Sequence, residues 1–316
     1  MLLGFISGVL GCALWGFIYL VPLLASDYNS VSIAMCRFTF FGVGSFFFVK
    51  KYWPEIRLLS KRDWFNAFNL AFIGNAVYYI FLSQGIKFSG APLAGMLMAF
   101  IPVLVALITN RKSAENNIVV PWSKLSIPLL MILVGLFIAN QGEFDLVKSG
   151  AGTMTFWIGA LCSTTAMLLW VWFPVENSRW LLRHPQVSPF AWTTAQGLAI
   201  LPVTIVCYLI ANWEAVLGEK PLFGPEPLQF IGLMCFAGIV CGWGGMALWN
   251  FMSSRLPPAL SGQMIVFETI FSVIYAFIYR EEWPEPLLVF GFILLVSGVF
   301  ISLKLFRNAA EFAEFK

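Results

Sequence analysis

The feature that most constrains this chain is a series of apolar runs, each long enough to cross a lipid bilayer. A transmembrane helix needs roughly 20 mostly apolar residues. The chain contains ten such runs, and short segments rich in charged and turn-forming residues separate them. The runs span about residues 3–24, 30–49, 64–86, 91–109, 124–140, 154–174, 190–211, 228–252, 259–279 and 286–305. This pattern predicts an all-α polytopic membrane protein of ten transmembrane helices.

Composition supports the same fold class. Hydrophobic residues make up 59% of the 316 residues and charged residues 11%, whereas about 25% of a typical soluble domain is charged. The net charge of +3 gives no indication of a nucleic-acid partner. All six cysteines lie inside apolar runs without a CxxC spacing, which predicts buried fillers rather than disulfides or metal ligands. No basic residue precedes the first run, so we expect a retained helix rather than a cleaved signal.

The distribution of Lys and Arg predicts the orientation in the membrane. With the N-terminus in the cytoplasm, the inner loops and tail hold 14 of the 19 basic residues and the outer loops hold four, while Arg37 lies inside a helix. Cytoplasmic loops of membrane proteins carry this excess of positive charge. Both termini are therefore predicted to be cytoplasmic (N-in/C-in).

Ten helices divide into two halves of five, residues 1–150 and 151–316. The segments Gly90–Ile108 and Pro257–Ile278 align with Leu93 opposite Leu260 and Gly95 opposite Gly262. An odd number of helices per half makes the second half enter the bilayer from the opposite side. The sequence thus predicts two inverted five-helix repeats, an arrangement that secondary transporters use with the binding site at the repeat interface.

Several of these segments also carry a family resemblance. They are "GVLGCALWGFIYLVP" in the first helix, "AMCRFTFFG" in the second, "APLAGMLMAFIPVLVAL" in the fourth and "GQMIVFETIFSVIYAFIYREEW" in the ninth. The chain resembles ten-helix, EamA-type members of the drug/metabolite transporter superfamily over nearly its whole length. The resemblance implies two five-helix halves around a central cavity, and transport of small metabolites, often export of amino acids or related compounds. It also implies that helices 1, 3, 4, 6, 8 and 9 line the cavity.

Glu268 is the residue of greatest interest, because it lies in the middle of an apolar run. A charged side chain at the centre of a transmembrane helix costs about 2.5–3.5 kcal/mol on insertion scales, so such residues face the protein interior or a watery cavity. We expect Glu268 to bind a substrate ammonium group or a proton; the alternative is an interior hydrogen bond or an ion pair with Arg37. Arg37 lies inside the second helix, nearer its outer end, and a structural role is expected for it.

Other polar and aromatic residues in the runs complete the predicted site. Asn75 lies near the midplane, and Tyr78 and Tyr79 follow it on one helix face. Gln263 is five residues before Glu268. The amides of Gln196 and Asn250 lie nearer helix ends, where hydrogen bonding between helices is the expected role.

Tryptophans fall into two groups. Those at helix ends are typical of the interfacial belt, but Trp15, Trp170 and Trp243 lie inside runs. Aromatic faces can hold an organic cation, so these three are candidate binding residues, with core packing as the alternative. Next to Trp243, the glycines at 242, 244 and 245 predict either a bend in the eighth helix or close packing. Gly238 and Gly242 also have a small-x-x-x-small spacing.

No enzyme motif is present: there is one histidine, no cluster of metal-ligand spacing, no G-x-S-x-G and no Walker sequence. We therefore expect neither catalysis nor a cofactor. The expected function is secondary transport of a small amine or zwitterion across the cell (inner) membrane, with export favoured and with protons as the candidate coupling ion. Uptake of a small organic cation and flipping of a lipid-linked metabolite are the alternatives.

Overall fold

The computed structural model describes residues 2–98, 100–101, 104–105, 108, 120–139, 153–256, 261–262, 264–281, 283 and 286–314. These residues form a bundle of helices, with no β-strand among them. Six of the described helices are long and apolar enough to cross a membrane, and three shorter apolar helices accompany them. The predicted all-α polytopic class is confirmed. The predicted number of ten transmembrane helices stays a prediction. In run 91–109, the continuous helix that the structure describes ends at Met98.

The N-terminal part of the bundle consists of four apolar segments. The helical elements are α1 (Leu2–Gly16), η1 (Phe17–Tyr19), α2 (Val21–Leu24), α3 (Ser30–Ile56), α4 (Lys61–Ala71), η2 (Phe72–Val77), α5 (Tyr78–Met98) and α7 (Trp122–Ala139). The backbone of α5 is interrupted at Gly90, where φ is 85°. This positive φ strains residues with a Cβ, so glycine is suited to the break between the third and fourth predicted runs.

The C-terminal part of the described chain is also helical. Its elements are α9 (Met154–Arg183), α10 (Pro189–Ala211), α11 (Trp213–Val216), α12 (Pro227–Cys235), η5 (Phe236–Gly244), α13 (Gly245–Ser253), α15 (Ile265–Arg280) and α16 (Pro286–Glu314). Side-chain caps set several helix starts: Asn29 accepts from the Ser32 amide, Ser188 from the Ala191 amide, and Ser60 and Asp63 cap each other's backbone.

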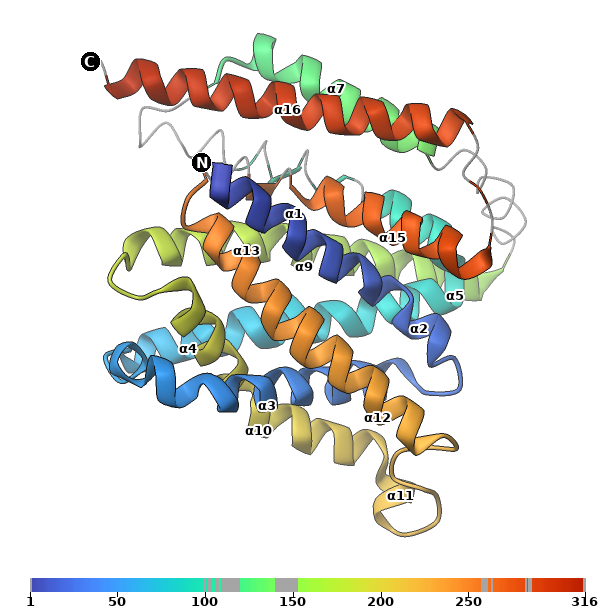
Figure 1. The fold of residues 1–316 in the computed structure, drawn as a ribbon. Coiled ribbons are helices and arrows are strands. Elements are labelled where there is room, and N and C mark those ends of the chain that lie inside the picture. Colours follow the sequence, from blue (N-terminus) through green and yellow to red (C-terminus); the bar gives the residue numbers. More distant parts are fainter. Residues whose placement is uncertain are drawn as a thin grey trace.

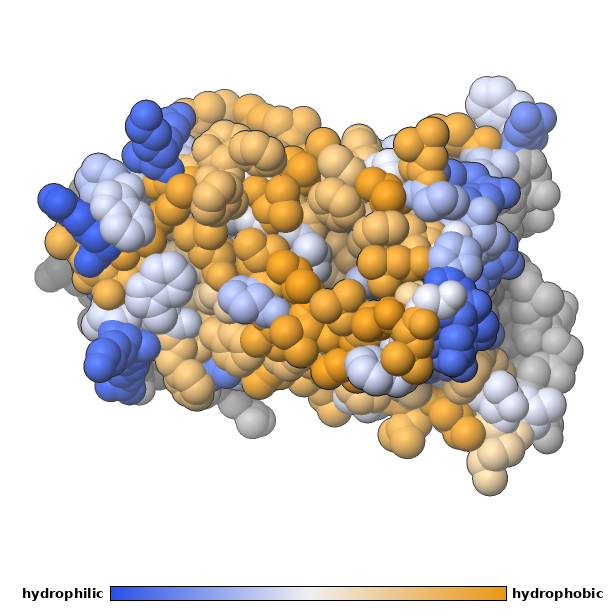
Figure 2. Space-filling view, turned by 90° about the horizontal axis from the view of Figure 1, so that it is seen from below, coloured by the Kyte–Doolittle hydropathy of each residue, from blue (hydrophilic) through white to orange (hydrophobic). Residues whose placement is uncertain are grey.

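The helices are arranged in layers (Figure 1). Helices α7 and α16 lie side by side along one edge of the bundle, and α3 and α10 pack together at the opposite edge. Between them, α5 packs against α9 and α1 packs against α13. The start of α1 and the end of α16 lie at the same end of the bundle. Seen from below, apolar residues cover the middle of the surface and hydrophilic residues gather at its two ends, as expected for a membrane-spanning bundle (Figure 2).

Two segments of the third and eighth predicted helices are π-helical, η2 and η5. Such wide turns are rare and occur often at functional sites. The carbonyls in and beside them accept side-chain hydrogen bonds: Asn75 Nδ2 donates to Leu70 O at 2.9 Å, and Trp15 Nε1 donates to Cys241 O at 3.0 Å. The glycine-rich stretch thus includes irregular, π-helical backbone. It also packs closely, because a Cβ on Gly245 would lie 2.5 Å from Trp15 Nε1.

A buried polar network joins α9, α10 and α13. Asn177 donates to Asn250 Oδ1 at 2.7 Å and accepts from Trp192 Nε1 and Gln196 Nε2, both at 3.0 Å. Asn250 in turn donates to Thr193 Oγ1 at 2.8 Å. Gln196 and Asn250 therefore connect helices through hydrogen bonds, as expected from the sequence.

We expect Asn177→Leu to lower the free energy of unfolding by about 1–2 kcal/mol, because it leaves Trp192 and Gln196 without their acceptor and hydrogen bonds between membrane helices average about 0.6 kcal/mol. Thermal unfolding of the purified protein in detergent measures the loss. Gln229→Leu, at an exposed amide of α12, serves as the control. Equal melting temperatures for the two variants would show that the network does not stabilise the fold.

Candidate functional site

A small cavity in the bundle collects most of the predicted site residues. Its lining includes Glu268 from α15, Arg37 from α3, Asn75 from η2 and Trp15 from α1. The volume is about 20 Å³, which is room for about one water molecule. Predicted residues from α1, α3, η2, α5, α9 and α15 therefore meet at one place. The complete set of predicted residues in the lining is Trp15, Arg37, Asn75, Tyr78, Tyr79, Trp170 and Glu268.

Glu268 is buried, with 4% of its surface exposed. Its Oε2 atom has no hydrogen-bond partner among the described residues. Trp170, whose ring lies in the same lining, also has an unpartnered Nε1. Buried polar atoms in proteins are nearly always hydrogen-bonded. An unpaired carboxylate oxygen and an unpaired indole N–H at one cavity are thus groups that a bound molecule could satisfy.

Arg37 does not form the predicted ion pair. No salt bridge joins it to Glu268 among the described residues, although both line the cavity. Its guanidinium lies over the rings of Tyr79, at 4.4 Å, and Phe38, at 4.7 Å, and its Nε donates to the Ala237 carbonyl at 3.4 Å. The charge is therefore held by aromatic faces and by a carbonyl of the π-helical segment η5.

The aromatic residues form a connected wall. Tyr78 stacks on Trp170 with ring centroids 4.7 Å apart, and Trp15 meets Trp170 edge-on at 5.4 Å. The Tyr79 hydroxyl donates to the Ile18 carbonyl at 3.0 Å, which fixes its ring between α5 and η1. A wall of this kind presents π faces to a cavity that also holds a carboxyl group, a combination suited to an organic cation.

Two predicted residues are not part of this cavity. The Trp243 ring stacks on Phe48 at 3.9 Å and its Nε1 faces Thr194 Oγ1 at 3.4 Å, so it packs between η5, α3 and α10. In this structure Trp243 packs between helices, which was the alternative to a binding role. Gln263 lies outside the described residues.

The sequence reasoning also missed lining residues. Tyr19, Ile18, Phe38 and Leu82 complete the cavity. Tyr19 carried a usable signal, since it is a hydroxyl-bearing residue inside the first apolar run. The three apolar residues gave no sequence signal of a position in the cavity, because the same residue types face lipid elsewhere in the chain.

The fold and the cavity define a multi-pass membrane protein with a small cavity among its helices, lined by aromatic rings together with Glu268, Arg37 and Asn75. The sequence pattern of the EamA-like transporter family matches residues 2–138. Over 308 residues the chain is 32% identical to "Inner membrane protein YtfF" of Escherichia coli (strain K12), covering 96% of each chain. The chain belongs to the EamA-like transporter family and is a multi-pass inner membrane protein.

Other relatives agree with this assignment. An "Uncharacterized transporter" of Archaeoglobus fulgidus is 22% identical over 248 residues, 77% of each chain. A solved crystal structure superimposes with a TM-score of 0.70 over 97% of both chains at 18% identity, which shows a shared fold. The family thus supports a membrane transporter rather than an enzyme.

Proposed function

We propose that the protein is a secondary transporter of a small amine or zwitterionic metabolite, with Glu268 as its central binding group. The observation that carries the proposal is the unpartnered Glu268 carboxylate oxygen in a cavity walled by Trp15, Trp170 and Tyr78. A carboxyl group pairs with an ammonium group, and aromatic faces stabilise the same positive charge. A substrate carboxylate would have Arg37 as its counter-charge at the other side of the site.

Alternating access between two inverted halves is the proposed mechanism. Its support is the symmetry of the helix pairing. In the predicted repeat, α1 corresponds to α9, α3 to α10, α5 to α13 and α7 to α16. The packed pair α1–α13 therefore has the pair α9–α5 as its counterpart in the other half, and α3–α10 and α7–α16 each pair a helix with its own counterpart. The π-helical segments also correspond, since η2 lies in the third predicted helix of the first half and η5 in the third of the second. A cavity with room for about one water molecule has to widen to admit a metabolite, and these irregular segments adjoin it.

The small volume of the cavity and the charged groups in its lining favour a solute carrier over a lipid flippase. A flippase site would open sideways between helices through an apolar wall, whereas this cavity is small and has Glu268 and Arg37 among its aromatic rings. Export is the proposed direction, in keeping with the family.

Transport by the purified protein in proteoliposomes tests the proposal. Radiolabelled amino acids and amines are offered one at a time, with and without an imposed pH gradient, and empty liposomes give the background. We expect saturable uptake or release for at least one amine-bearing compound. If only neutral or anionic solutes move, the assignment of an amine substrate to this site is wrong.

A further inference from the structure

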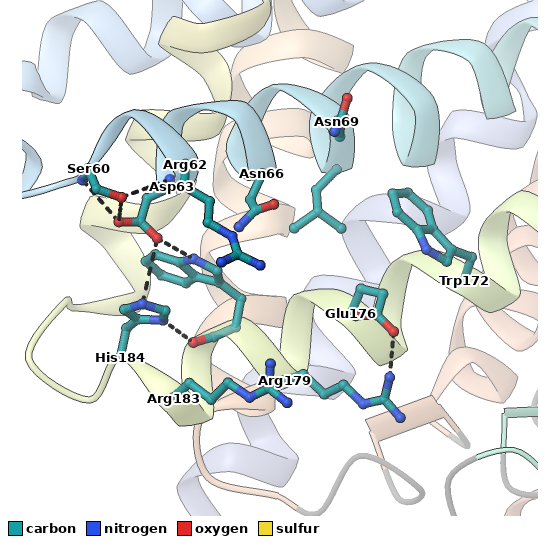
Figure 3. Close-up of a pocket in the computed structure, with 12 residues that line it drawn as sticks. Ser60, Arg62, Asp63, Asn66, Asn69, Trp172, Glu176, Arg179, Arg183 and His184 are labelled. Carbon is teal, nitrogen blue, oxygen red and sulfur yellow. Dashed lines mark hydrogen bonds and ion pairs between the residues drawn. The ribbon is translucent and has the colours of Figure 1, made fainter. Parts of the chain in front are cut away.

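A second and larger pocket lies between α4 and the C-terminal part of α9 (Figure 3). It shares no lining residue with the central cavity. Its volume is about 540 Å³, within the range of sites for small ligands. One wall is a face of α4 that carries Arg62, Asn66 and Asn69, and the other is a face of α9 that carries Arg179 and Arg183. Both sets recur at helical three- and four-residue spacing, so each lies along one face of its helix.

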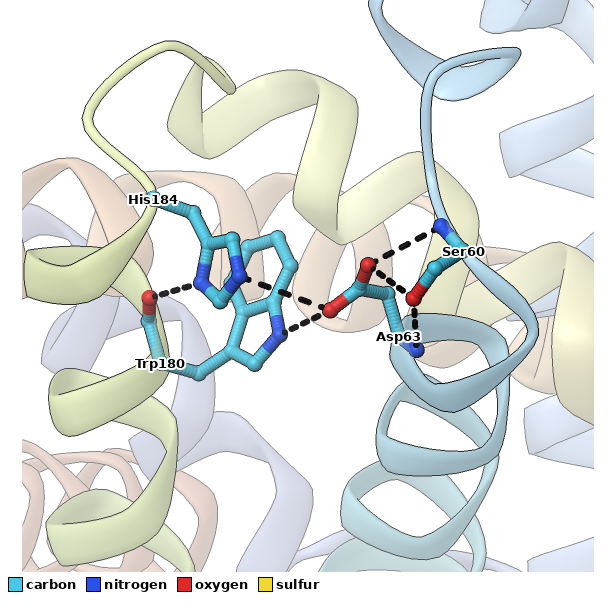
Figure 4. Close-up of polar contacts among 4 residues, drawn as sticks. All are labelled: Ser60, Asp63, Trp180 and His184. Atoms are coloured by element: carbon cyan, nitrogen blue, oxygen red, sulfur yellow. Dashed lines mark hydrogen bonds and ion pairs between the residues drawn. The ribbon is translucent and has the colours of Figure 1, made fainter.

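The acidic groups of this pocket already have partners. Asp63 accepts from the Ser60 amide at 2.9 Å, from Ser60 Oγ at 2.6 Å and from Trp180 Nε1 at 3.0 Å (Figure 4). Its other neighbour is His184, whose Nε2 is 3.5 Å from Asp63 Oδ1. Glu176 is paired with Arg179 at 2.5 Å. Neither carboxylate is therefore the partner of Arg62 or Arg183.

Four donor side chains remain. In the part of the chain that the structure describes, the guanidinium groups of Arg62 and Arg183 and the amides of Asn66 and Asn69 make no hydrogen bond or ion pair. They come from two facing helices and line one cavity (Figure 3). Such an arrangement places positive charge and several hydrogen-bond donors along the same space. An anion with several acceptor oxygens would satisfy both.

We propose that this pocket binds a phosphate group. Arginine forks match phosphate and carboxylate geometry. A phosphate offers more acceptor oxygens and up to two negative charges, which fits two free guanidinium groups and two amides better than the two oxygens of a carboxylate. The phosphate is that of a soluble solute or of an anionic lipid headgroup at the membrane surface. This proposal does not depend on the proposed transport function.

Binding of inorganic phosphate to the full-length protein in detergent tests the site. Isothermal titration calorimetry is expected to show saturable binding, weakened about tenfold or more by Arg62→Gln and by Arg183→Gln. Arg57→Gln is the matched control, since Arg57 is an exposed arginine of the same region that does not line the pocket. Thermal unfolding of each variant confirms that it is folded.

A second arm distinguishes the two sources of phosphate. The protein is reconstituted in nanodiscs of phosphatidylcholine with and without phosphatidylglycerol, and bound lipid is counted by native mass spectrometry. Retained phosphatidylglycerol that is lost in Arg62→Gln and Arg183→Gln supports a lipid headgroup, and phosphate binding unaffected by phosphatidylglycerol supports a soluble ligand. The proposal is overturned if neither probe binds saturably, or if Arg57→Gln weakens binding as much as the pocket variants, since the arginines would then act only as general surface charge.

Discussion

Glu268→Gln is expected to abolish measurable transport of an amine substrate, or to reduce it by about 100-fold. The substitution preserves shape but removes the negative charge. Hydrogen bonds to charged groups contribute about 1.5–3 kcal/mol, and a loss near the upper limit of this range corresponds to about two orders of magnitude in affinity. Glu268 is buried in the lining of the cavity with an unpaired oxygen, so water cannot replace its charge. Initial rates in proteoliposomes over a range of substrate concentrations measure the effect.

The control for this variant is Glu214→Gln. Glu214 is exposed on α11 and pairs with Lys220 at the surface, so the same chemical change there should leave transport as it is. If Glu268→Gln abolishes the response to a pH gradient but retains substrate binding, then the carboxyl group carries a proton rather than the substrate. Full transport with an unchanged response to the gradient would exclude both roles for Glu268.

Gly238→Ala is expected to lower the free energy of unfolding by about 3 kcal/mol, the upper part of the range for overpacked cores. A Cβ at Gly238 would lie 2.3 Å from the Arg37 carbonyl oxygen and 2.9 Å from the Phe41 amide nitrogen. These are backbone atoms of α3, which cannot move aside without separating the two helices. The separation would also displace the carbonyl of Ala237, to which Arg37 donates.

Gly232→Ala gives a matched comparison for that variant. Gly232 lies six residues earlier in the same predicted helix, and a Cβ there would meet no atom within 4 Å. Replacing glycine with alanine in an open helical position stabilises by about 0.4–1 kcal/mol. Melting temperatures in detergent should therefore shift in opposite directions. A fall of the same size for both variants would mean that helix flexibility, rather than the close contact with α3, explains the effect.

Most of the central site could be predicted from single residues. Glu268, Arg37 and Asn75 are polar groups within apolar runs, and the cost of placing them in lipid already implies an interior position. Their meeting at one cavity could not be derived this way. The ion pair with Arg37, which was the alternative role for Glu268, is not formed among the described residues. Trp243 could not be told apart from Trp15 by sequence, because both lie deep within an apolar run. The structure separates them, since the Trp243 ring packs against Phe48 outside the cavity.

The phosphate pocket was missed although its residues are conspicuous. Arg62 and Arg183 were counted only as cytoplasmic loop charges, because loop segments give no indication of which helix ends lie opposite each other. The spacing of Arg62, Asn66 and Asn69 was a readable signal of a polar helix face. Its partner face on α9 became evident only once the structure placed α4 beside it.

The amino-acid sequence alone determined that the protein lies in a lipid bilayer and that it is an all-α membrane protein. Apolar runs of bilayer length require helices in lipid, since each backbone polar group has to be paired within its own segment. The tertiary structure decided which face of each helix points inward. Lipid tails are as apolar as leucine side chains, so no hydrophobic difference separates an inner from an outer face. Only close packing, at contacts such as Gly238 against Arg37, and the pairing of buried polar groups select the faces that surround the Glu268 cavity.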